Sequence, residues 1–242
     1  MPDFAARSNQ PELMDTESLS FQDFNLYLSH LEYINRFTFL YGPVLRWLDK
    51  EHLVKPAKPL EILEIASGGG DTARQIWRFS QKNNFNVKVI GIDINPYATK
   101  TAQIKTPGGA PLYFKTADVF SYTPPIKPEY IISIQFTHHL EDKNLITFIA
   151  WLDRTAEYGW FIYDLHRHPI PYYFIKYVLK FLPVYHFAKN DGPLSVAKAF
   201  TKADWESFLQ KAGIEQSRVS IKWHFPFRYS IACRKSNIYE DK

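Results

Sequence analysis

The sequence predicts an α/β protein in which helices cover both faces of a parallel sheet. Short apolar segments alternate with amphipathic ones between residues 60 and 165, which is the pattern of strand–helix repeats. Several apolar segments, such as residues 130–136, are hydrophobic on both faces, as strands buried inside such a sheet must be. Right-handed crossovers between these strands give a doubly wound arrangement.

The elements follow from local signals in order along the chain. Residues 1–18 are polar and are expected to be loose. Ser20 followed by Asp23 predicts the start of a helix over 20–37, and a second helix is expected from Pro43 to about Leu53. The expected strands are 60–65, 87–93, 112–118, 130–136 and 160–165, and the expected helices between them are 71–81, 96–104 and 143–157.

The alternation lapses after residue 165. Residues 169–187 are rich in aromatic side chains and are expected to be helical, and residues 201–212 form a further expected helix that ends at Gly213. In the segment NDGPLS, Asp191 is expected to begin a turn and Pro193 to start a helix. Residues 218–223 and 228–233 alternate like an antiparallel pair and are expected to be the last two strands.

This pattern predicts two regions. A helical N-terminal extension covers residues 1–55, and a single domain covers residues 56–242. That domain contains an aromatic-rich insertion at about 169–200.

Composition narrows the class of protein. The net charge is +4, without the dense basic patch of a nucleic-acid binder, so no nucleic-acid partner is expected. A single cysteine, Cys233, excludes a disulfide framework and favours the cytoplasm. The acidic N-terminus does not resemble a signal peptide, and no apolar run reaches the length of about 18 residues that stable membrane insertion needs. A monomer or a homodimer is expected.

Three glycines, Gly68, Gly69 and Gly70, stand together between the first strand and its helix. Glycines let a ligand approach the backbone, and the start of the helix offers free N–H groups. Asp93 and Asp118 end the second and third strands, where carboxylates can bind ribose hydroxyls and an adenine amino group. The three signals meet at the carboxyl edge of the sheet and predict a site for a nucleoside-containing cofactor.

The two best-known phosphate loops do not fit this glycine run. A dinucleotide loop needs G-x-G-x-x-G, but the third glycine is missing and the acid Asp71 follows the run. A loop of the form G-x-x-x-x-G-K-[ST] is absent as well.

The arrangement resembles class I S-adenosylmethionine-dependent methyltransferases. Glu64, Gly68 and Gly70 match the family's first motif, [DE]-x-G-x-G-x-G, with Ala66 in place of its first glycine. The resemblance implies a Rossmann-like sheet of seven strands in the order 3-2-1-4-5-7-6 with one antiparallel strand, and S-adenosyl-L-methionine as the cofactor. The residues expected to bind it are Glu64, Ala66, Ser67, Gly68, Gly70, Asp93, Ile94, Asp118, Val119, Gln135 and Arg36.

Two further stretches resemble a bacterial subgroup of small-molecule methyltransferases associated with polyketide-type secondary metabolism. One is the prefix that begins PELMD, at residues 11–15, and the other spans residues 164–201.

Histidines are the candidate bases, should the acceptor have to lose a proton. His138 and His139 follow the fourth strand and His166 follows the fifth, so the implied strand order brings all three to one edge. We predict these three as catalytic residues. Asp164, His166 and His168 could also bind a divalent metal, but the set favours no particular ion, and no metal is expected.

The region after the fifth strand is expected to bind the acceptor. Arg167 and Arg36 could each form a bidentate ion pair with a carboxylate, either of the cofactor or of an acidic substrate. Tyr172, Tyr173 and Tyr177 belong to an aromatic stretch that suits a flat or lipophilic acceptor. The same rings could instead pack onto the core or lie at a membrane interface.

We therefore predict an S-adenosylmethionine-dependent methyltransferase of a small aromatic or lipophilic metabolite, with O-methylation favoured over C-methylation. Alternatives are an RNA or protein methyltransferase, a non-catalytic cofactor-binding protein and a nicotinamide oxidoreductase. Against the first of these, residues 135–138 read QFTH instead of the amino-methylating signature [DN]-P-P-[FYW]. The missing third glycine argues against the last.

Overall fold

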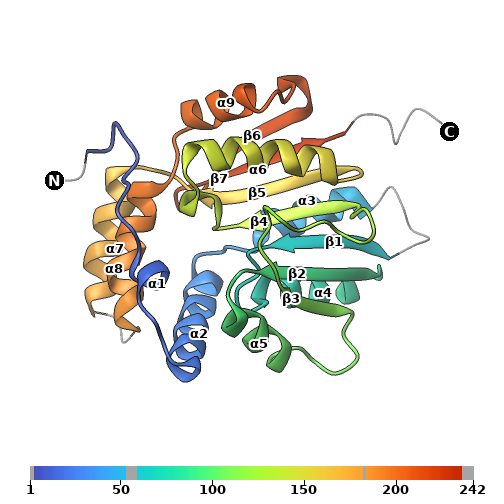
Figure 1. Ribbon diagram of the computed structural model, residues 1–242, viewed down its shortest axis with the longest axis horizontal. Coiled ribbons are helices and arrows are strands. Elements are labelled where there is room, and N and C mark those ends of the chain that lie inside the picture. The colour runs from blue at the N-terminus through green and yellow to red at the C-terminus, as the bar shows by residue number, and fades with distance from the viewer. Residues whose placement is uncertain (1–2, 53–58, 182–183, 236–242) are drawn as a thin grey trace.

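The computed structural model describes residues 3–52, 59–181 and 184–235, which surround a central sheet of seven strands (Figure 1). The strand order is β3-β2-β1-β4-β5-β7-β6. β7 runs antiparallel to both of its neighbours, whereas the other neighbouring pairs are parallel. The order and the single antiparallel strand confirm the prediction. The strands are β1 (Leu60–Ile65), β2 (Val87–Asp93), β3 (Leu112–Thr116), β4 (Tyr130–Ile134), β5 (Gly159–Leu165), β6 (Val219–His224) and β7 (Arg228–Arg234).

Helices cover both faces of this sheet, as predicted. α3 (Gly42–His52), α4 (Asp71–Lys82) and α5 (Pro96–Ile104) contribute to the core on one face. α6 (Asp142–Thr155) and α9 (Lys202–Lys211) pack together on the other. The apolar side chains of β1 point alternately into these two cores, which explains why the strand is buried almost throughout.

The register brings several strand ends to one edge. Ile65, the last residue of β1, pairs with Ile92 of β2 and with Ser133 of β4. The carboxyl ends of these parallel strands therefore lie side by side, where doubly wound sheets bind their ligands. The short helix η1 (Thr137–His139) follows β4 at this edge, and a second one, η2 (Gln216–Arg218), precedes β6.

Four helices gather beside the carboxyl edge, at the left of Figure 1. They are α1 (Leu13–Thr16), α2 (Phe21–Phe37), α7 (Pro169–Phe181) and α8 (His186–Lys198). The predicted cap of α2 is confirmed, because the Ser20 hydroxyl accepts a hydrogen bond from the Asp23 N–H at 3.1 Å. None of the described helices has both the length and the apolar character needed to cross a membrane.

Two local predictions were wrong. The described part of the N-terminal segment, residues 3–18, is not loose, because Glu12 is buried and the backbone N–H groups of Leu13 and Met14 donate to Asp191. Asp191 does not begin a turn and Pro193 does not start a helix, because both lie inside α8. This helix begins earlier, where Phe187 packs into a small apolar cluster. The predicted domain boundary at residue 55 and the predicted helix end at Leu53 lie outside the described residues.

Candidate active site

The loop after β1 carries the glycine run and turns into α4. Its backbone is left-handed at Ala66, Gly68 and Gly70, with φ values of 55°, 51° and 72°. A Cβ added at Gly70 would lie 2.6 Å from the Phe114 ring, so a larger residue would displace that ring. Ala66, where the resemblance expects glycine, adopts a conformation that favours glycine. The loop therefore has a glycine-type backbone at these three positions.

Asp93, at the end of β2, is fixed against this loop. Its Oδ2 accepts a hydrogen bond from the Gly68 N–H at 2.8 Å, and its Oδ1 accepts one from the Asn95 N–H at 2.9 Å. Burial raises the pKa of Asp93, while these two N–H groups oppose the shift. The neighbouring Ile94 side chain is 71% exposed although it is apolar. An oriented carboxylate beside an exposed apolar surface suits a nucleoside.

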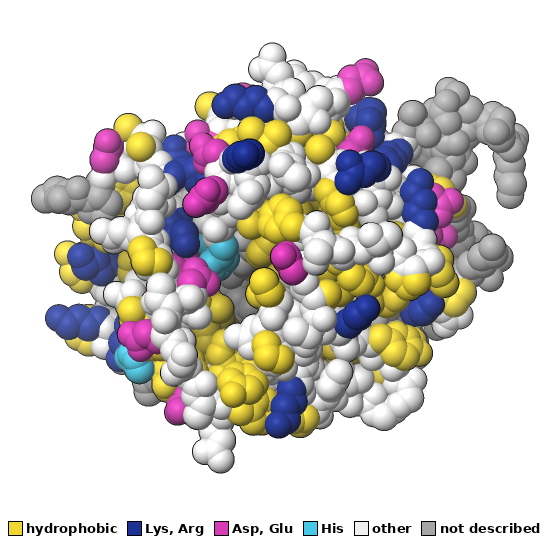
Figure 2. Space-filling view, in the orientation of Figure 1, with side chains coloured by type: hydrophobic (Ala, Val, Ile, Leu, Met, Phe, Trp, Pro, Cys, Tyr) yellow, Lys and Arg dark blue, Asp and Glu magenta, His cyan; other side chains and the backbone are white. Residues whose placement is uncertain are grey.

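The end of β3 lies at the same edge. Asp118 is exposed, and its Oδ1 accepts a hydrogen bond from the Phe120 N–H at 3.0 Å, while Val119 is buried in the core below it. Figure 2 shows a hollow in this part of the surface, with a histidine side chain at its rim.

Two polar atoms beneath the glycine loop have no hydrogen-bond partner among the described residues. They are Glu64 Oε2 and Ser67 Oγ, and both side chains are buried. Burial, followed by the charge of Asp71, raises the pKa of Glu64 well above its ordinary value. Buried polar atoms without partners are uncommon in folded proteins, so these two are notable at the junction of β1 and the glycine loop.

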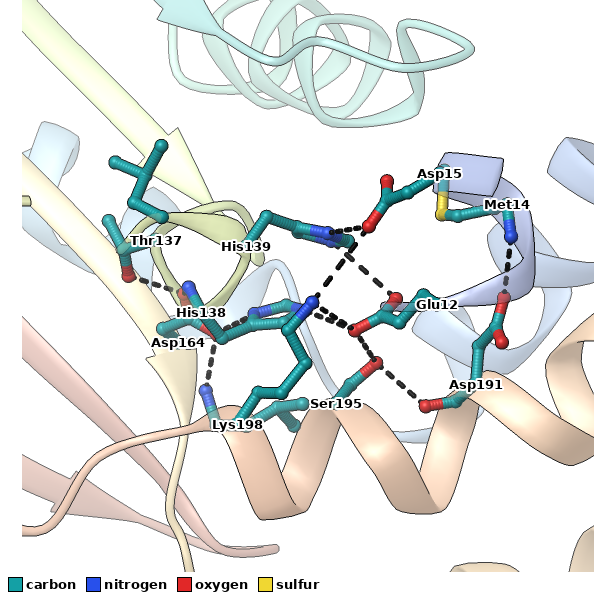
Figure 3. Close-up of polar contacts among 12 residues, drawn as sticks. Glu12, Met14, Asp15, Thr137, His138, His139, Asp164, Asp191, Ser195 and Lys198 are labelled. Atoms are coloured by element: carbon teal, nitrogen blue, oxygen red, sulfur yellow. Dashed lines mark hydrogen bonds and ion pairs between the residues drawn. The ribbon is translucent and has the colours of Figure 1, made fainter. Parts of the chain in front are cut away.

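A polar cluster lies where α1, η1, β5 and α8 meet (Figure 3). Glu12 is at its centre and is 2% exposed. The Ser195 hydroxyl donates to Glu12 Oε1 at 3.0 Å, and the Lys198 ammonium lies 3.5 Å from the same oxygen. The cluster therefore binds the N-terminal segment to α8 through a buried carboxylate.

His138 is enclosed in this cluster. Its Nδ1 lies 2.7 Å from Asp164 Oδ1, and its Nε2 lies 3.9 Å from Glu12 Oε1. Burial raises the pKa of Asp164, but His138 and the hydrogen bond from Thr137 outweigh it and lower the pKa to about 2. Because His138 is only 3% exposed, its imidazole can position neighbouring groups but reaches no open surface.

His139 is more accessible than His138. Its Nδ1 lies 3.2 Å from Asp15 Oδ2, and its Nε2 lies 3.8 Å from Glu12 Oε2. Burial lowers the pKa of His139, but the bond to Asp15 and the charge of Glu12 outweigh it, so the pKa lies above its ordinary value. The charge of His139 also lowers the pKa of Asp93, so this imidazole is electrostatically coupled to the predicted ribose-binding carboxylate.

Donor atoms of Glu12, His138 and His139 lie within 4.8 Å of one another, close enough to ligate one metal ion. Lys198 Nζ, however, lies 3.5 Å from Glu12 and 3.8 Å from Asp15, so the protein itself supplies a cation there. The expectation of no metal stays a prediction.

His166 and Arg167 follow β5 but face different surroundings. His166 Nδ1 accepts a hydrogen bond from the Trp223 indole at 3.3 Å, and its ring packs edge-on against Tyr229. The guanidinium of Arg167 is buried, where it pairs with Asp204 at 2.8 Å and donates to the Ala199 carbonyl. The Arg167 side chain is thereby committed to internal contacts.

The predicted acceptor-binding tyrosines lie on α7. The ring of Tyr172 packs edge-on against Phe4, from the N-terminal segment, and against Tyr173, whereas Tyr177 is exposed. The Tyr177 ring is stacked on Tyr173 with ring centroids 6.4 Å apart, so the three rings form one contiguous group. Their role in acceptor binding stays a prediction.

Gln135 and Arg36, both predicted to touch the cofactor, lie outside the glycine loop itself, directly after β4 and near the end of α2. Gln135 follows β4 and has a left-handed backbone, with a φ of 52°. When its amide oxygen is turned toward Arg228, that oxygen accepts a hydrogen bond from Arg228 Nε at 3.2 Å. Arg36 is exposed near the end of α2 and lines a cavity of about 490 Å³.

Sequence reasoning missed Glu12, Asp15 and Lys198 as parts of the site. Glu12 and Asp15 lie in a polar stretch without helical periodicity, so no local pattern predicts their burial. The only signal was the PELMD prefix, which resembles a methyltransferase subgroup. Arg46 and His224, which line the cavity together with Arg36, were missed as well.

No established protein family matches the sequence, and no curated protein sequence is significantly similar to it. Solved structures do match. Magnesium protoporphyrin IX methyltransferase from Synechocystis PCC 6803, with bound S-adenosylmethionine, is 16% identical, with a TM-score of 0.56 over 83% of this chain and 80% of that one. A methyltransferase dependent on the same cofactor from Aquifex aeolicus is 14% identical, with a TM-score of 0.59 over 90% and 99%.

Human N-acetylserotonin methyltransferase, in complex with S-adenosylmethionine, is 15% identical, with a TM-score of 0.64 over 90% of this chain and 57% of that one. Similarity at these identities establishes a shared fold. The strand order agrees with the one that the sequence resemblance implies. The chain therefore has the fold of the class I S-adenosylmethionine-dependent methyltransferases.

Proposed function

We propose that this chain transfers a methyl group from S-adenosyl-L-methionine to a small aromatic or lipophilic metabolite, at oxygen in preference to carbon. The observation that carries this proposal is the contact between Asp93 and Gly68 at 2.8 Å. It orients a carboxylate toward the place where the ribose of a nucleoside lies in such sheets.

The other residues of the loop fit the same cofactor. Ile94 offers an exposed apolar surface to the adenosyl group, and Asp118 has a second carboxylate oxygen for the adenine amino group. The unpaired atoms of Glu64 and Ser67 can bind the polar amino-acid end. When bound, S-adenosylmethionine supplies a methyl group already activated by its sulfonium, so the protein mainly has to position the acceptor and exclude water.

An acceptor hydroxyl must also lose its proton. We assign this task to His139, because it is the more accessible of the two adjacent histidines and is coupled to Asp93. Asp15 holds its Nδ1 and thereby leaves Nε2 as the nitrogen that receives the proton. His138, enclosed between Asp164 and Glu12, is a positioning residue for this pair.

Proteins of similar fold whose structures have been solved support a small-molecule acceptor. The similar structures include methyltransferases of magnesium protoporphyrin IX, N-acetylserotonin and plantazolicin. These acceptors belong to those proteins. For this chain, the exposed aromatic side chains near the carboxyl edge favour an acceptor with a flat apolar body.

Calorimetric titration tests the cofactor first. We expect S-adenosylmethionine and S-adenosylhomocysteine to bind in the micromolar range and NAD not to bind. A methyl-transfer assay with phenols and lipophilic acids then tests turnover. Absence of binding by both adenosyl ligands would contradict the proposal, and binding without turnover of any acceptor would favour a non-catalytic cofactor-binding protein.

A further inference from the structure

A cavity of about 490 Å³ lies between the α2–α3 turn and the β6–β7 hairpin. Its volume is within the range of small-molecule sites, which is roughly 300–1,000 Å³. One wall comes from Arg36, Phe39 and Arg46, and the other comes from His224 and Phe225 at the hairpin turn. The cavity thus joins two segments that are distant in sequence.

The charge of this cavity is positive. Arg36 and Arg46 line it, no acidic residue does, and neither arginine forms an ion pair with an acid among the described residues. Gly42 leaves room for the Arg46 guanidinium over the first turn of α3, because a Cβ placed there would lie 3.0 Å from Arg46 Nη1. Burial and the charge of Arg46 also lower the pKa of His224. An anion would relieve this concentration of positive charge.

The rim of the cavity is aromatic. Phe39 is 69% exposed and Phe225 is 71% exposed, although rings of this size are normally buried. Phe39 also has a left-handed backbone, with a φ of 55°. A strained residue that holds an exposed ring beside a cavity is a feature of ligand-binding sites. The rings suit the apolar face of a flat molecule.

The cavity adjoins the glycine loop. Tyr41 lines it, and the Tyr41 hydroxyl donates a hydrogen bond at 2.6 Å to Asp71, the residue directly after Gly70. On the hairpin side, the Arg228 guanidinium at the start of β7 donates a hydrogen bond to the Thr38 carbonyl of the α2–α3 turn at 3.1 Å. A molecule in the cavity would therefore lie next to the place proposed for the amino-acid end of the cofactor.

We propose that this cavity binds the carboxylate of an aromatic acid, with Arg36 and Arg46 on the carboxylate and Phe39 and Phe225 on the ring, and that this acid is the methyl acceptor. The assignment of the acid as acceptor rests on the proposed function. The same carboxylate chemistry occurs in the methionine part of the cofactor, so the experiment must separate these two sources.

The test uses the full chain and 2-naphthoate, whose fluorescence reports binding, with neutral 2-naphthalenemethanol as the matched ligand. We expect naphthoate to bind at least tenfold more tightly than the alcohol. Arg46→Gln and Arg36→Gln should each remove most of that preference, because a charge-assisted hydrogen bond is lost. Arg154→Gln, which removes an exposed arginine at the end of α6, should leave it unchanged.

A second titration, with S-adenosylhomocysteine, identifies the source of the carboxylate. The proposal expects naphthoate to bind in the presence of saturating S-adenosylhomocysteine and the arginine variants to retain their affinity for that ligand. Mutual exclusion of the two ligands would overturn the proposal while leaving the methyltransferase function intact. Naphthoate binding without any binding of S-adenosylhomocysteine would instead contradict the proposed function. Equal binding of naphthoate and the alcohol would show that the cavity does not select anions.

Turnover gives an independent readout. With hydroxybenzoates as acceptors, Arg46→Gln should raise KM about 10- to 100-fold with little change in kcat, while KM for the corresponding phenol stays the same. An equal change for both acceptors would overturn the carboxylate assignment. Unchanged circular dichroism spectra of the arginine variants would confirm that they fold.

Discussion

The Tyr41 hydroxyl and the Asp71 carboxylate, joined by a hydrogen bond of 2.6 Å, connect the α2–α3 turn to the helix behind the glycine loop. Asn35 of α2 donates to the same carboxylate at 3.1 Å, so α2 and the turn that follows it both contact Asp71. Arg74 reinforces the contact from α4 by pairing with Glu32 at 2.8 Å. The proposed cofactor site and the cavity beside it are therefore parts of one connected structure.

Asp93→Ala should weaken the binding of S-adenosylmethionine about 10- to 100-fold, because it removes a charged acceptor worth roughly 1.5–3 kcal/mol. Calorimetric titration measures the change. Glu157→Gln, which neutralises an exposed acid outside the site, is the control. A Kd within threefold of the original for the alanine variant would contradict the role of Asp93 in the proposed cofactor site.

Gly70→Ala should cost more stability than Gly68→Ala. Both positions have a left-handed backbone, which costs a Cβ-bearing residue roughly 1–2 kcal/mol. Only at Gly70 does the new Cβ collide with Phe114, at 2.6 Å, and overpacking adds roughly 1–3 kcal/mol. Urea unfolding measures the difference, and equal midpoints for the two variants would show that the Phe114 ring moves aside freely.

Glu12→Gln should release the N-terminal segment. The change leaves Lys198 buried without its nearest carboxylate, and removing one partner of a buried pair typically costs about 3–5 kcal/mol. Trypsin should then cut faster after Arg7, whose guanidinium is otherwise hydrogen-bonded to Leu140 and His138 carbonyls. Glu17→Gln, at an exposed acid of the same segment, is the matched control. Equal cleavage rates for both variants would contradict the anchoring role of Glu12.

His166 should remain neutral well into the acid range. Burial, together with the charges of His168 and Arg167, lowers its pKa to about 4. Because the unfolded chain protonates this histidine near pH 6.5, its contribution to the free energy of unfolding is complete above that pH. The contribution decreases as the pH falls toward about 4. An NMR titration of the imidazole should show no transition between pH 8 and pH 5.5, and a midpoint above pH 6 would refute the assignment. His166→Gln should remove this part of the pH dependence of stability.

Asp15→Asn should change the pH dependence of turnover. Burial lowers the pKa of His139, but the hydrogen bond to Asp15 outweighs burial and keeps this pKa above its ordinary value. If His139 is the base, turnover therefore increases only as the pH rises through that pKa. Removing the Asp15 charge should move this acidic limb of the kcat profile to lower pH. His139→Gln should lower kcat by about 100-fold or more. An unchanged limb in Asp15→Asn would show that another group takes the proton.

Much of the fold was accessible from sequence because its signals are local. The apolar strand over 60–65 and the Ser20 cap need only neighbouring residues to be recognised, and both agree with the structure. The sheet order came from the family resemblance and is confirmed. Pro193 was misjudged because proline is most common at helix starts, whereas here the preceding turn is stabilised by the tertiary packing of Phe187.

The site was only partly accessible. Glycines and acids at strand ends have recognisable spacing, so the loop and Asp93 were found where the structure has them. Burial of Glu12 depends on Ser195 and Lys198, more than 180 residues away, and no local pattern encodes such a contact. The same holds for Arg46 and His224, which share a cavity only after the sheet has formed.

The anchoring of Glu12 has a consequence for the timing of biosynthesis. Its partner Ser195 lies 183 residues further along the chain. At a translation rate of about 5–20 residues per second, Glu12 leaves the ribosome roughly 10–40 s before the part of α8 that receives it. During that interval the Glu12 carboxylate remains in water. A chaperone that binds nascent chains, or a protease, has access to this segment before α8 does.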